Sequence, residues 1–380
     1  MFTKNECLSA NIYVEGQGVV RCKMLCRDGK ILSFGEYDER TALPERLIVL
    51  PGFIDKHIHG AGGTDCMRDE NALRVMSARL AEEGVTRFLP TTMTAPARDV
   101  EAALSRMGRQ IEYDRFDGAL PIGIHLEGPF IHPSRAGAQP VEDILPFSEE
   151  LFDRWNEISH RRIRQVTYAP ERNPGMTKAL TKRGIVPSVG HTMATAADVL
   201  TAERDGALSA THVFNAMTPL SHRACGTVGG VMLSDTLFCE LICDGKHVEK
   251  EAVRVLYKTA KGRITLVTDA TEAKGLPAGK YHLGKNPIVV RDDLARLEDG
   301  TIAGSVLKMN DAVRNFSEFC GVKIEEAVDA ASLLPAKCLR IDDVCGSIAL
   351  GKVADFVVCD EKVNVFQTIR NGKTIYQKQL

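Results

Sequence analysis

The stretch that decides the fold is Gly52-Phe53-Ile54-Asp55-Lys56-His57-Ile58-His59-Gly60. It is an apolar run typical of a buried strand, and it ends in two histidines that are one residue apart. Residues i and i+2 of a strand point to the same face, so the rings of His57 and His59 are expected to lie together where the strand stops. Two such imidazoles suit a divalent metal ion. By itself, a pattern this short is also typical of two half-buried histidines without a ligand.

The rest of the chain contains further apolar runs of this kind. We count eight strand-like runs, which end near His59, Thr92, Glu127, Ala169, His191, His212, Asp244 and Asp269. Helical segments lie between most of them, and continuous apolar strands that alternate with helices indicate a parallel sheet. Eight such units predict an α/β fold of the (β/α)8 TIM-like barrel type.

Both ends of the chain are rich in strand patterns and the middle is not. Near the C-terminus, Asn371-Gly372 lies between two strand-like runs, which is a strong hairpin signal. We therefore expect a small β-sandwich domain formed from both termini, residues 1–50 plus 346–380. Residues 51–345 are expected to form the barrel, with a β-insertion near 280–303 after its eighth strand.

The composition is that of a globular protein, with 44% hydrophobic and 26% charged residues. A formal net charge of -2 gives no reason to expect a nucleic-acid partner. No apolar run approaches the ~18 residues of a membrane span. The 11 cysteines form no C-x-x-C pair and the N-terminus carries no secretory signal pattern, so we expect reduced thiols and a cytoplasmic location.

Polar residues end five of the eight predicted strands. They are His57 and His59 in the first strand, Glu127 in the third, His191 in the fifth, His212 in the sixth and Asp269 in the eighth. The carboxyl ends of barrel strands share one face, where the active sites of this fold lie. Four histidines and two carboxylates are therefore expected to meet in one mouth. His125 should lie one layer deeper, either beside the cluster or as a packed core histidine.

The motifs around these residues resemble the amidohydrolase superfamily and, more closely, the family of N-acetylglucosamine-6-phosphate deacetylases. The matching stretches are PGFIDKHIHG, HLEGPFI, GHT, THVFNAMTPL, ICDGKHV, VTDA and DGTIAGS, which span nearly the whole chain. The resemblance implies hydrolysis of N-acetyl-D-glucosamine 6-phosphate to D-glucosamine 6-phosphate and acetate. It also implies that Glu127, His191 and His212 hold one divalent ion and that His57 and His59 allow a second, with zinc or iron expected.

The resemblance further assigns the proton transfers to Asp269, as general base and then general acid. Substrate-binding positions carried over from the family are Gln139, Asn215, Ala216, Arg223 and His247. Arg223 and His247 match positions that reach the sugar phosphate across the interface of a homodimer, and a dianion suits both side chains. Gln139 stands where other members have a histidine, a departure that bears on sugar specificity.

Three alternatives are weighed against this function. Deacetylation of the galacto epimer, N-acetylgalactosamine 6-phosphate, differs only in the sugar. A cyclic amidase would usually bridge its metals with a modified lysine, and Glu127 at the end of the third strand argues against that. A non-catalytic scaffold would typically have lost metal ligands, whereas every ligand position and Asp269 are retained here.

Overall fold

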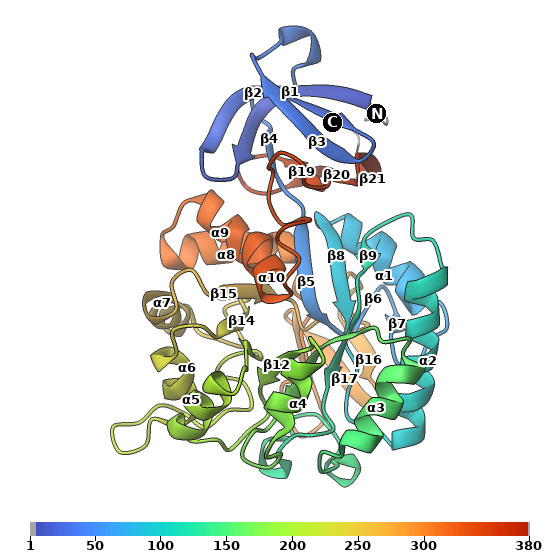
Figure 1. The fold of residues 1–380 in the computed structure, drawn as a ribbon, viewed down its shortest axis with the longest axis vertical. Coiled ribbons are helices and arrows are strands. Elements are labelled where there is room, and N and C mark those ends of the chain that lie inside the picture. The colour runs from blue at the N-terminus through green and yellow to red at the C-terminus, as the bar shows by residue number, and fades with distance from the viewer. Residues whose placement is uncertain (1–4, 379–380) are drawn as a thin grey trace.

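The computed structural model describes residues 5–378, in which a barrel of strands and helices lies beneath a sheet formed by both ends of the chain (Figure 1). Residues 1–4 and 379–380 of the expected terminal domain lie outside the described residues. In the part of the chain that is described, no helix is long and apolar enough to cross a lipid bilayer.

The barrel contains eight strands at the predicted places. They are β5 (Phe53–Ile58), β8 (Val85–Pro90), β10 (Ile124–Glu127), β11 (Ile163–Tyr168), β12 (Val186–Val189), β13 (Ser209–Ala210), β14 (Phe238–Ile242) and β15 (Ile264–Val267). Strands β10 to β15 pair in parallel in one sheet, and β5 pairs with β8 in another, which also contains β9 (Leu120–Pro121). Parallel bridges from Thr91 to His125 and from Ile58 to Ala270 join the two sheets into a closed barrel. The predicted (β/α)8 fold is therefore confirmed.

Helices surround these strands because each buries one apolar face against them. They are α1 (Ala72–Ala81), α2 (Ala97–Tyr113), α3 (Glu149–Ile158), α4 (Met176–Lys182), α5 (Ala196–Arg204), α6 (Gly226–Leu233), α7 (Lys250–Thr259), α8 (Met309–Cys320), α9 (Ile324–Ala331) and α10 (Leu333–Cys338). In α2, Val100, Leu104 and Met107 are buried at the spacing of a helical stripe. Helix α5 starts at a capping box between Thr195 and Asp198.

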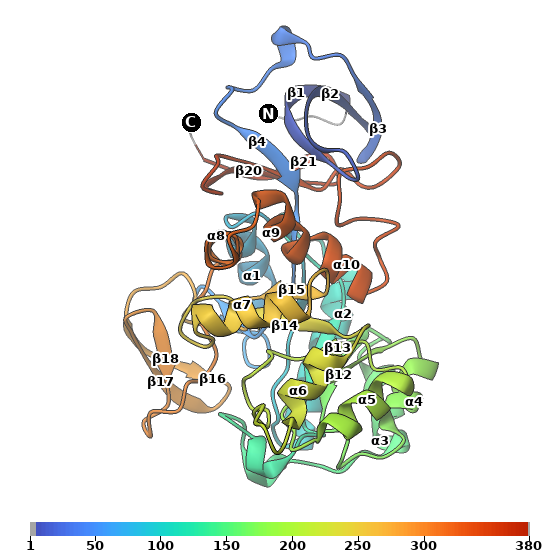
Figure 2. The same ribbon diagram turned by 90° about the vertical axis from the view of Figure 1, so that its left-hand side faces the viewer.

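The strands from both termini form one sheet within residues 5–378, in the order β21-β20-β19-β4-β1-β2-β3. Their bounds are β1 (Asn5–Val14), β2 (Gly18–Arg27), β3 (Lys30–Gly35), β4 (Ile48–Pro51), β19 (Phe356–Cys359), β20 (Val365–Arg370) and β21 (Lys373–Gln377). The sheet curls around a core that includes Ile12, Met24 and Phe356 (Figure 2). Asn371 and Gly372 both have positive φ in the β20–β21 turn, as a two-residue hairpin requires.

A buried ion pair connects this terminal sheet to the barrel. Arg87 Nε of β8 donates to Asp355 Oδ2, beside β19, at 2.8 Å, and both side chains are almost fully buried. Tyr13 of β1, in the terminal sheet, donates its hydroxyl to Asp329 of α9, on the barrel side, at 2.9 Å. The two parts are therefore tied by polar contacts as well as by the β4–β5 connection.

A small antiparallel sheet lies between β15 and α8. It consists of β16 (Gly279–Leu283), β17 (Asn286–Arg291) and β18 (Leu294–Arg296), and it has an apolar core of its own. Figure 2 shows this sheet at the side of the barrel, away from the terminal sheet. The remaining short elements are β6 (Gly60–Ala61), β7 (Thr64–Asp65), η1 (Glu39–Thr41), η2 (Pro133–Arg135) and η3 (Val141–Asp143). The division into domains at residues 50 and 346 stays a prediction.

Candidate active site

The six side chains expected at the strand ends converge at the mouth of the barrel. Five of them line a cavity of about 420 Å³: His59, Glu127, His191, His212 and Asp269. His57 lies directly behind them and is fully buried. The cavity is at the carboxyl ends of the strands, where the active sites of this fold are found.

Glu127 is at the centre of the cluster. Its Oε1 lies 3.2 Å from His191 Nε2, 3.1 Å from His212 Nε2 and 3.5 Å from His57 Nε2. Its Oε2 lies 3.6 Å from His59 Nε2. One carboxylate therefore separates two pairs of histidines, with His191 and His212 on one side and His57 and His59 on the other.

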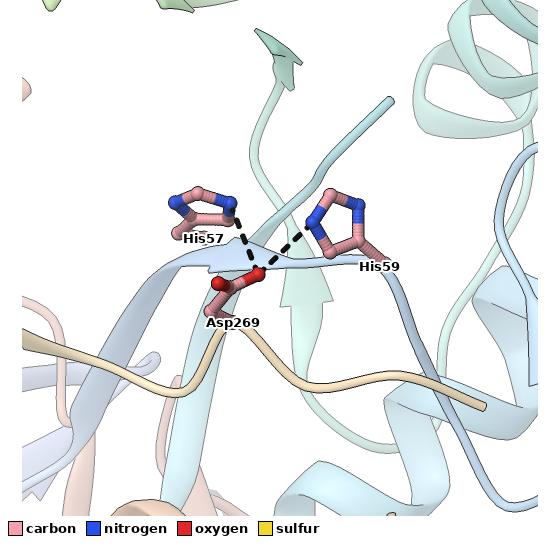
Figure 3. A group of neighbouring side chains, drawn as sticks. All are labelled: His57, His59 and Asp269. Carbon is pink, nitrogen blue, oxygen red and sulfur yellow. Dashed lines mark ion pairs between the residues drawn. The ribbon is translucent and has the colours of Figure 1, made fainter. Parts of the chain in front are cut away.

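Asp269 approaches the second of these pairs. Its Oδ1 lies 3.0 Å from His59 Nε2 and 3.4 Å from His57 Nε2, so that the carboxylate points between the two rings (Figure 3). The side chain comes from the end of β15, the last barrel strand. This strand is far from β5, the first barrel strand, in sequence but adjacent to it in space. The closing of the barrel between its first and last strands thus completes this half of the cluster.

The hydrogen bonds behind the histidines determine which ring nitrogen faces the cavity. His59 Nδ1 donates to the backbone oxygen of Thr91 at 3.0 Å, and His191 Nδ1 donates to that of Arg135 at 2.7 Å. A carbonyl oxygen can only accept, so each neutral ring carries its proton on Nδ1 and turns a lone pair on Nε2 toward Glu127. Among the described residues, His57 Nε2 has no hydrogen-bond partner although it is buried.

This arrangement fits one or two divalent cations. Glu127, His191 and His212 offer three ligand atoms close to one another, and so do His57, His59 and Asp269. Imidazole nitrogens with a carboxylate are the ligand set of zinc and of other late divalent ions. The Nε2 atoms of His191 and His212 lie only 3.0 Å apart, a spacing that a shared cation explains better than two facing lone pairs.

The backbone is strained at three of these residues. His191, His212 and Asp269 have φ values of 46°, 29° and 48°, in the left-handed region that non-glycine residues rarely adopt. Such conformations cost on the order of 1–3 kcal/mol each and occur where the surrounding structure imposes them, often at active sites. Each strained residue lies two positions beyond the end of a strand, and its side chain lines the cavity at the mouth.

Charge in the cluster is unbalanced without a cation. Burial alone would raise the pKa of Glu127, but the surrounding histidines outweigh it and hold that pKa well below its ordinary value. The pKa of Asp269 is lowered in the same way. Burial lowers the pKa of His59, yet the hydrogen bond and charge of Asp269 prevail and raise it to about 9. The mouth therefore attracts positive charge, either protons or metal ions.

Four of the five residues predicted to bind substrate line the same cavity: Gln139, Asn215, Ala216 and His247. Gln139 is buried, and its Nε2 donates to Glu127 Oε2 at 3.0 Å. His247 lies in the cavity of its own chain, where its Nδ1 is 2.6 Å from Asp244 Oδ2. Within residues 5–378 the cavity lining does not include Arg223, which is exposed in the turn between Ser221 and Ala224.

Sequence reasoning missed a second polar group beneath the cluster. Glu240 of β14 and Lys56 of β5 are fully buried and form an ion pair at 2.5 Å. A signal existed, because a charged residue inside an apolar strand is rarely buried without a partner. His125 lies at this depth, as expected, with its ring against that of His57 and its Nε2 2.7 Å from Thr167 Oγ1.

The cavity also has an apolar wall that the sequence did not reveal. Leu283 of β16, Ile302 and Met93, which follows β8, line the same cavity as the metal-ligand candidates. The Nδ2 of Asn286 donates to the backbone oxygen of Ala138 at 2.7 Å, which ties the small sheet to the loop that carries Gln139.

A sequence model of the amidohydrolase family matches residues 48–375. The chain belongs to the amidohydrolase family. An N-acetylglucosamine-6-phosphate deacetylase of Bacillus subtilis (strain 168) is 39% identical over an alignment of 362 residues, and the match covers 92% of this chain and 91% of that protein. The recognition made from the sequence motifs is therefore confirmed.

Solved structures agree with the sequence comparison. The N-acetylglucosamine-6-phosphate deacetylase of Thermotoga maritima superimposes on this amidohydrolase with a TM-score of 0.90 at 34% identity, and the match covers 98% of this chain and 100% of that one. A mutant of the Mycobacterium smegmatis deacetylase, solved in complex with N-acetyl-D-glucosamine-6-phosphate, gives a TM-score of 0.91 at 29% identity, with 98% and 100% covered. The likeness extends over both the barrel and the terminal sheet.

Proposed function

We propose that this amidohydrolase catalyses the metal-dependent hydrolysis of N-acetyl-D-glucosamine 6-phosphate to D-glucosamine 6-phosphate and acetate. One observation carries the proposal: Glu127, His191 and His212 gather in one cavity with Asp269, in a chain 39% identical to a curated deacetylase. A non-catalytic scaffold has no need for this ligand set or for strained backbone at its ends. The reaction belongs to the breakdown and recycling of amino sugars.

The proposed chemistry divides between an ion and a carboxylate. An acetamide is a poor electrophile and water is a poor nucleophile, and a bound divalent ion lowers the pKa of water to about 7 and polarises a carbonyl. Asp269 is the proposed proton acceptor, since its carboxylate faces the cavity and its low pKa keeps it ionised. It takes a proton from the attacking water and returns it to the sugar nitrogen as the C–N bond breaks, which releases acetate.

Gln139 is the proposed donor to the acetyl group. Its Oε1 accepts from the backbone N–H of Thr94 at 2.9 Å, which fixes the orientation of the amide and leaves Nε2 facing Glu127. A donor at this point can orient the carbonyl oxygen of a bound acetamide. The amide of Gln139 stays neutral and donates at any pH, unlike the titratable histidine that other family members carry.

The phosphate end of the substrate is proposed to lie near Asn215, Ala216 and His247. The Nε2 of His247 is buried beside the cavity and has no hydrogen-bond partner among the described residues. Its Nδ1 donates to Asp244, so the imidazolium form of the ring would present Nε2–H to an anionic ligand. Arg223 is exposed and outside this cavity, which is consistent with a contribution to the site of another subunit. We therefore also propose a homodimer.

Acetate release tests the proposed reaction. The substrates are N-acetylglucosamine 6-phosphate, its galacto epimer and unphosphorylated N-acetylglucosamine, each with metal-free protein and after addition of Zn²⁺ or Fe²⁺. We expect metal-dependent release, fastest from the first sugar. Faster release from the epimer would identify N-acetylgalactosamine 6-phosphate as the preferred substrate. No release from any amino sugar would overturn the proposal.

Zinc or iron is the proposed ion, and elemental analysis of the purified protein identifies it. The cytoplasm is the proposed location, in keeping with the 11 cysteines, all of which are free thiols. Localisation of a tagged chain by fractionation tests this second point.

A further inference from the structure

The buried carboxylate of Glu240 lies at the junction between the candidate metal ligands and the barrel interior. Its Oε1 accepts from Lys56 Nζ at 2.5 Å and from Gln165 Nε2 at 2.7 Å. Its Oε2 lies 3.0 Å from His57 Nδ1 and 3.3 Å from the backbone nitrogen of His212. Glu240, Lys56 and His57 have no exposed side-chain surface, so no water replaces these contacts.

The direction of these hydrogen bonds fixes the state of His57. An ionised carboxylate only accepts, so His57 must donate through Nδ1. The lone pair then lies on Nε2, which is 3.4 Å from Asp269 Oδ1 and has no hydrogen-bond partner within residues 5–378. The ring is thus held in the one tautomer that can ligate a cation at the mouth.

Lys56 makes this arrangement possible at such depth. A lone carboxylate is costly to bury, and a lone ammonium is equally so. As a pair they neutralise each other, and Lys56 is held in place by further bonds to Gln165 Oε1 at 3.0 Å and Ser209 Oγ at 3.1 Å. Glu240 therefore remains an acceptor rather than an acid that donates to the ring.

We propose that Glu240 is a positioning residue for His57, with Lys56 as its counter-ion, and that this pair creates the second cation site of His57, His59 and Asp269. The inference rests on the proposed metal-dependent function and adds to it a determinant of how many ions are bound. The site of Glu127, His191 and His212 does not depend on Glu240 in the same way, because the ring of His191 donates to a backbone carbonyl and Glu240 contacts His212 through its backbone nitrogen and not through its ring.

Glu240→Gln tests the proposal with a nearly isosteric change. The amide oxygen of the new side chain will face the two donors Lys56 and Gln165, which leaves its N–H group toward His57 Nδ1. The ring must then move its proton to Nε2, where it blocks a cation. Since partners behind metal ligands typically contribute 10–100-fold to affinity, we expect the second ion to bind about 10–100-fold more weakly while the first is retained.

The measurement is a titration of metal-free protein with Zn²⁺ against a competing chelator, together with the zinc content after dialysis. His57→Asn serves as the reference for loss of the second ion, and Gln165→Met as the matched control that removes a donor to Glu240 without touching His57. We expect Glu240→Gln to follow His57→Asn and Gln165→Met to follow wild type. Wild-type affinity for two ions in Glu240→Gln, or a wild type that accepts only one ion, would overturn the proposal.

A second readout needs no metal and separates positioning from folding. In ¹⁵N-histidine spectra of metal-free protein, the His57 signal, identified by its loss in His57→Asn, should show the proton on Nδ1 in wild type and on Nε2 in Glu240→Gln. An unchanged tautomer contradicts the proposal. If the single variant does not fold, Lys56→Met/Glu240→Leu, which buries no lone charge and leaves His57 Nδ1 without its acceptor, is expected to show the same loss of the second ion. A chain that binds two ions but releases no acetate would overturn the proposed function and leave this inference standing.

Discussion

The barrel contains two polar layers that differ in how their charges are balanced. The mouth layer consists of His59, Glu127, His191, His212 and Asp269, and the deep layer of Lys56, His125, Gln165, Ser209 and Glu240. In the deep layer Lys56 neutralises Glu240. The remaining N–H groups of Lys56 donate to the amide of Gln165 and the hydroxyl of Ser209. In the mouth layer the ion pairs found for the two carboxylates, in the described part of the chain, are with histidines alone.

The two layers also differ in backbone conformation. The deep residues lie within regular strands, whereas His191, His212 and Asp269 lie just beyond them with positive φ. A balanced network on regular strands contributes to the scaffold, and an unbalanced one on strained backbone is prepared for a ligand. His57 belongs to both, with Nδ1 in the deep layer and Nε2 toward the mouth.

Removal of the central charge of the mouth layer should have the largest effect. Glu127→Gln leaves no carboxylate between the two histidine pairs, so we expect tightly bound metal to be lost and turnover to fall to background. Elemental analysis after dialysis and acetate release measure both. Metal content equal to that of wild type would show that Glu127 does not hold the ions.

The next effect concerns the proton acceptor of the mouth layer. Asp269→Asn keeps the shape of the side chain but cannot accept a proton, so kcat should fall by at least about a hundredfold. Metal content and melting temperature should stay near those of wild type. Asp99→Asn, which alters a partly exposed carboxylate of α2, is the control and should keep full turnover. Substantial turnover in Asp269→Asn, or a loss that accompanies loss of metal or of stability, would indicate a structural acceptor instead.

The deep layer should respond in stability. Lys56→Met leaves Glu240 buried without its counter-ion, so the free energy of unfolding of metal-free protein should fall by about 3–5 kcal/mol. Glu127→Gln should lower the same quantity by less, because the histidines that hold the pKa of Glu127 below its ordinary value line a cavity, whereas the partners of Glu240 are fully buried. Chemical denaturation measures both variants. Equal destabilisation by the two changes would erase the distinction between the layers.

The smallest effect is expected at the two proposed phosphate contacts. Arg223→Ala and His247→Ala should each raise KM for the phosphorylated sugar about ten- to a hundredfold, the value of a charge-assisted hydrogen bond. KM for the unphosphorylated sugar should change little, and His222→Ala, at a neighbouring exposed position, should change neither. Equal losses on both sugars would exclude a phosphate contact.

A mixture of two impaired variants, assayed at a substrate concentration far below the raised KM of Arg223→Ala, tests the proposed dimer. If Arg223 serves the partner's site, a heterodimer of Arg223→Ala and Asp269→Asn contains one intact site, so mixing and exchange of subunits should raise activity above that of either variant. If Arg223 serves its own chain, each site keeps one defect and mixing brings no gain.

Much of the fold was predictable because its signal is local. Each barrel strand is a short apolar run, and the eight predicted ends lie at or near the observed ones, from Ile58 of β5 to Val267 of β15. The residues of the mouth layer were predictable for the same reason, since they end those runs. Their roles as ligands, base and substrate contacts remain predictions that the variants above examine.

The sequence by itself determined the strand order, the polar residue at each strand end and the family, because these depend on neighbours in the chain and on motifs. Only the tertiary structure decided which distant groups meet. Glu240 reaches His57 across 183 residues, Asp269 reaches His59 where the barrel closes, and Asn286 fastens the small sheet to the Gln139 loop. No local pattern encodes such contacts, since they depend on the curvature of the sheet and on the low tolerance of a buried interior for unpaired charge.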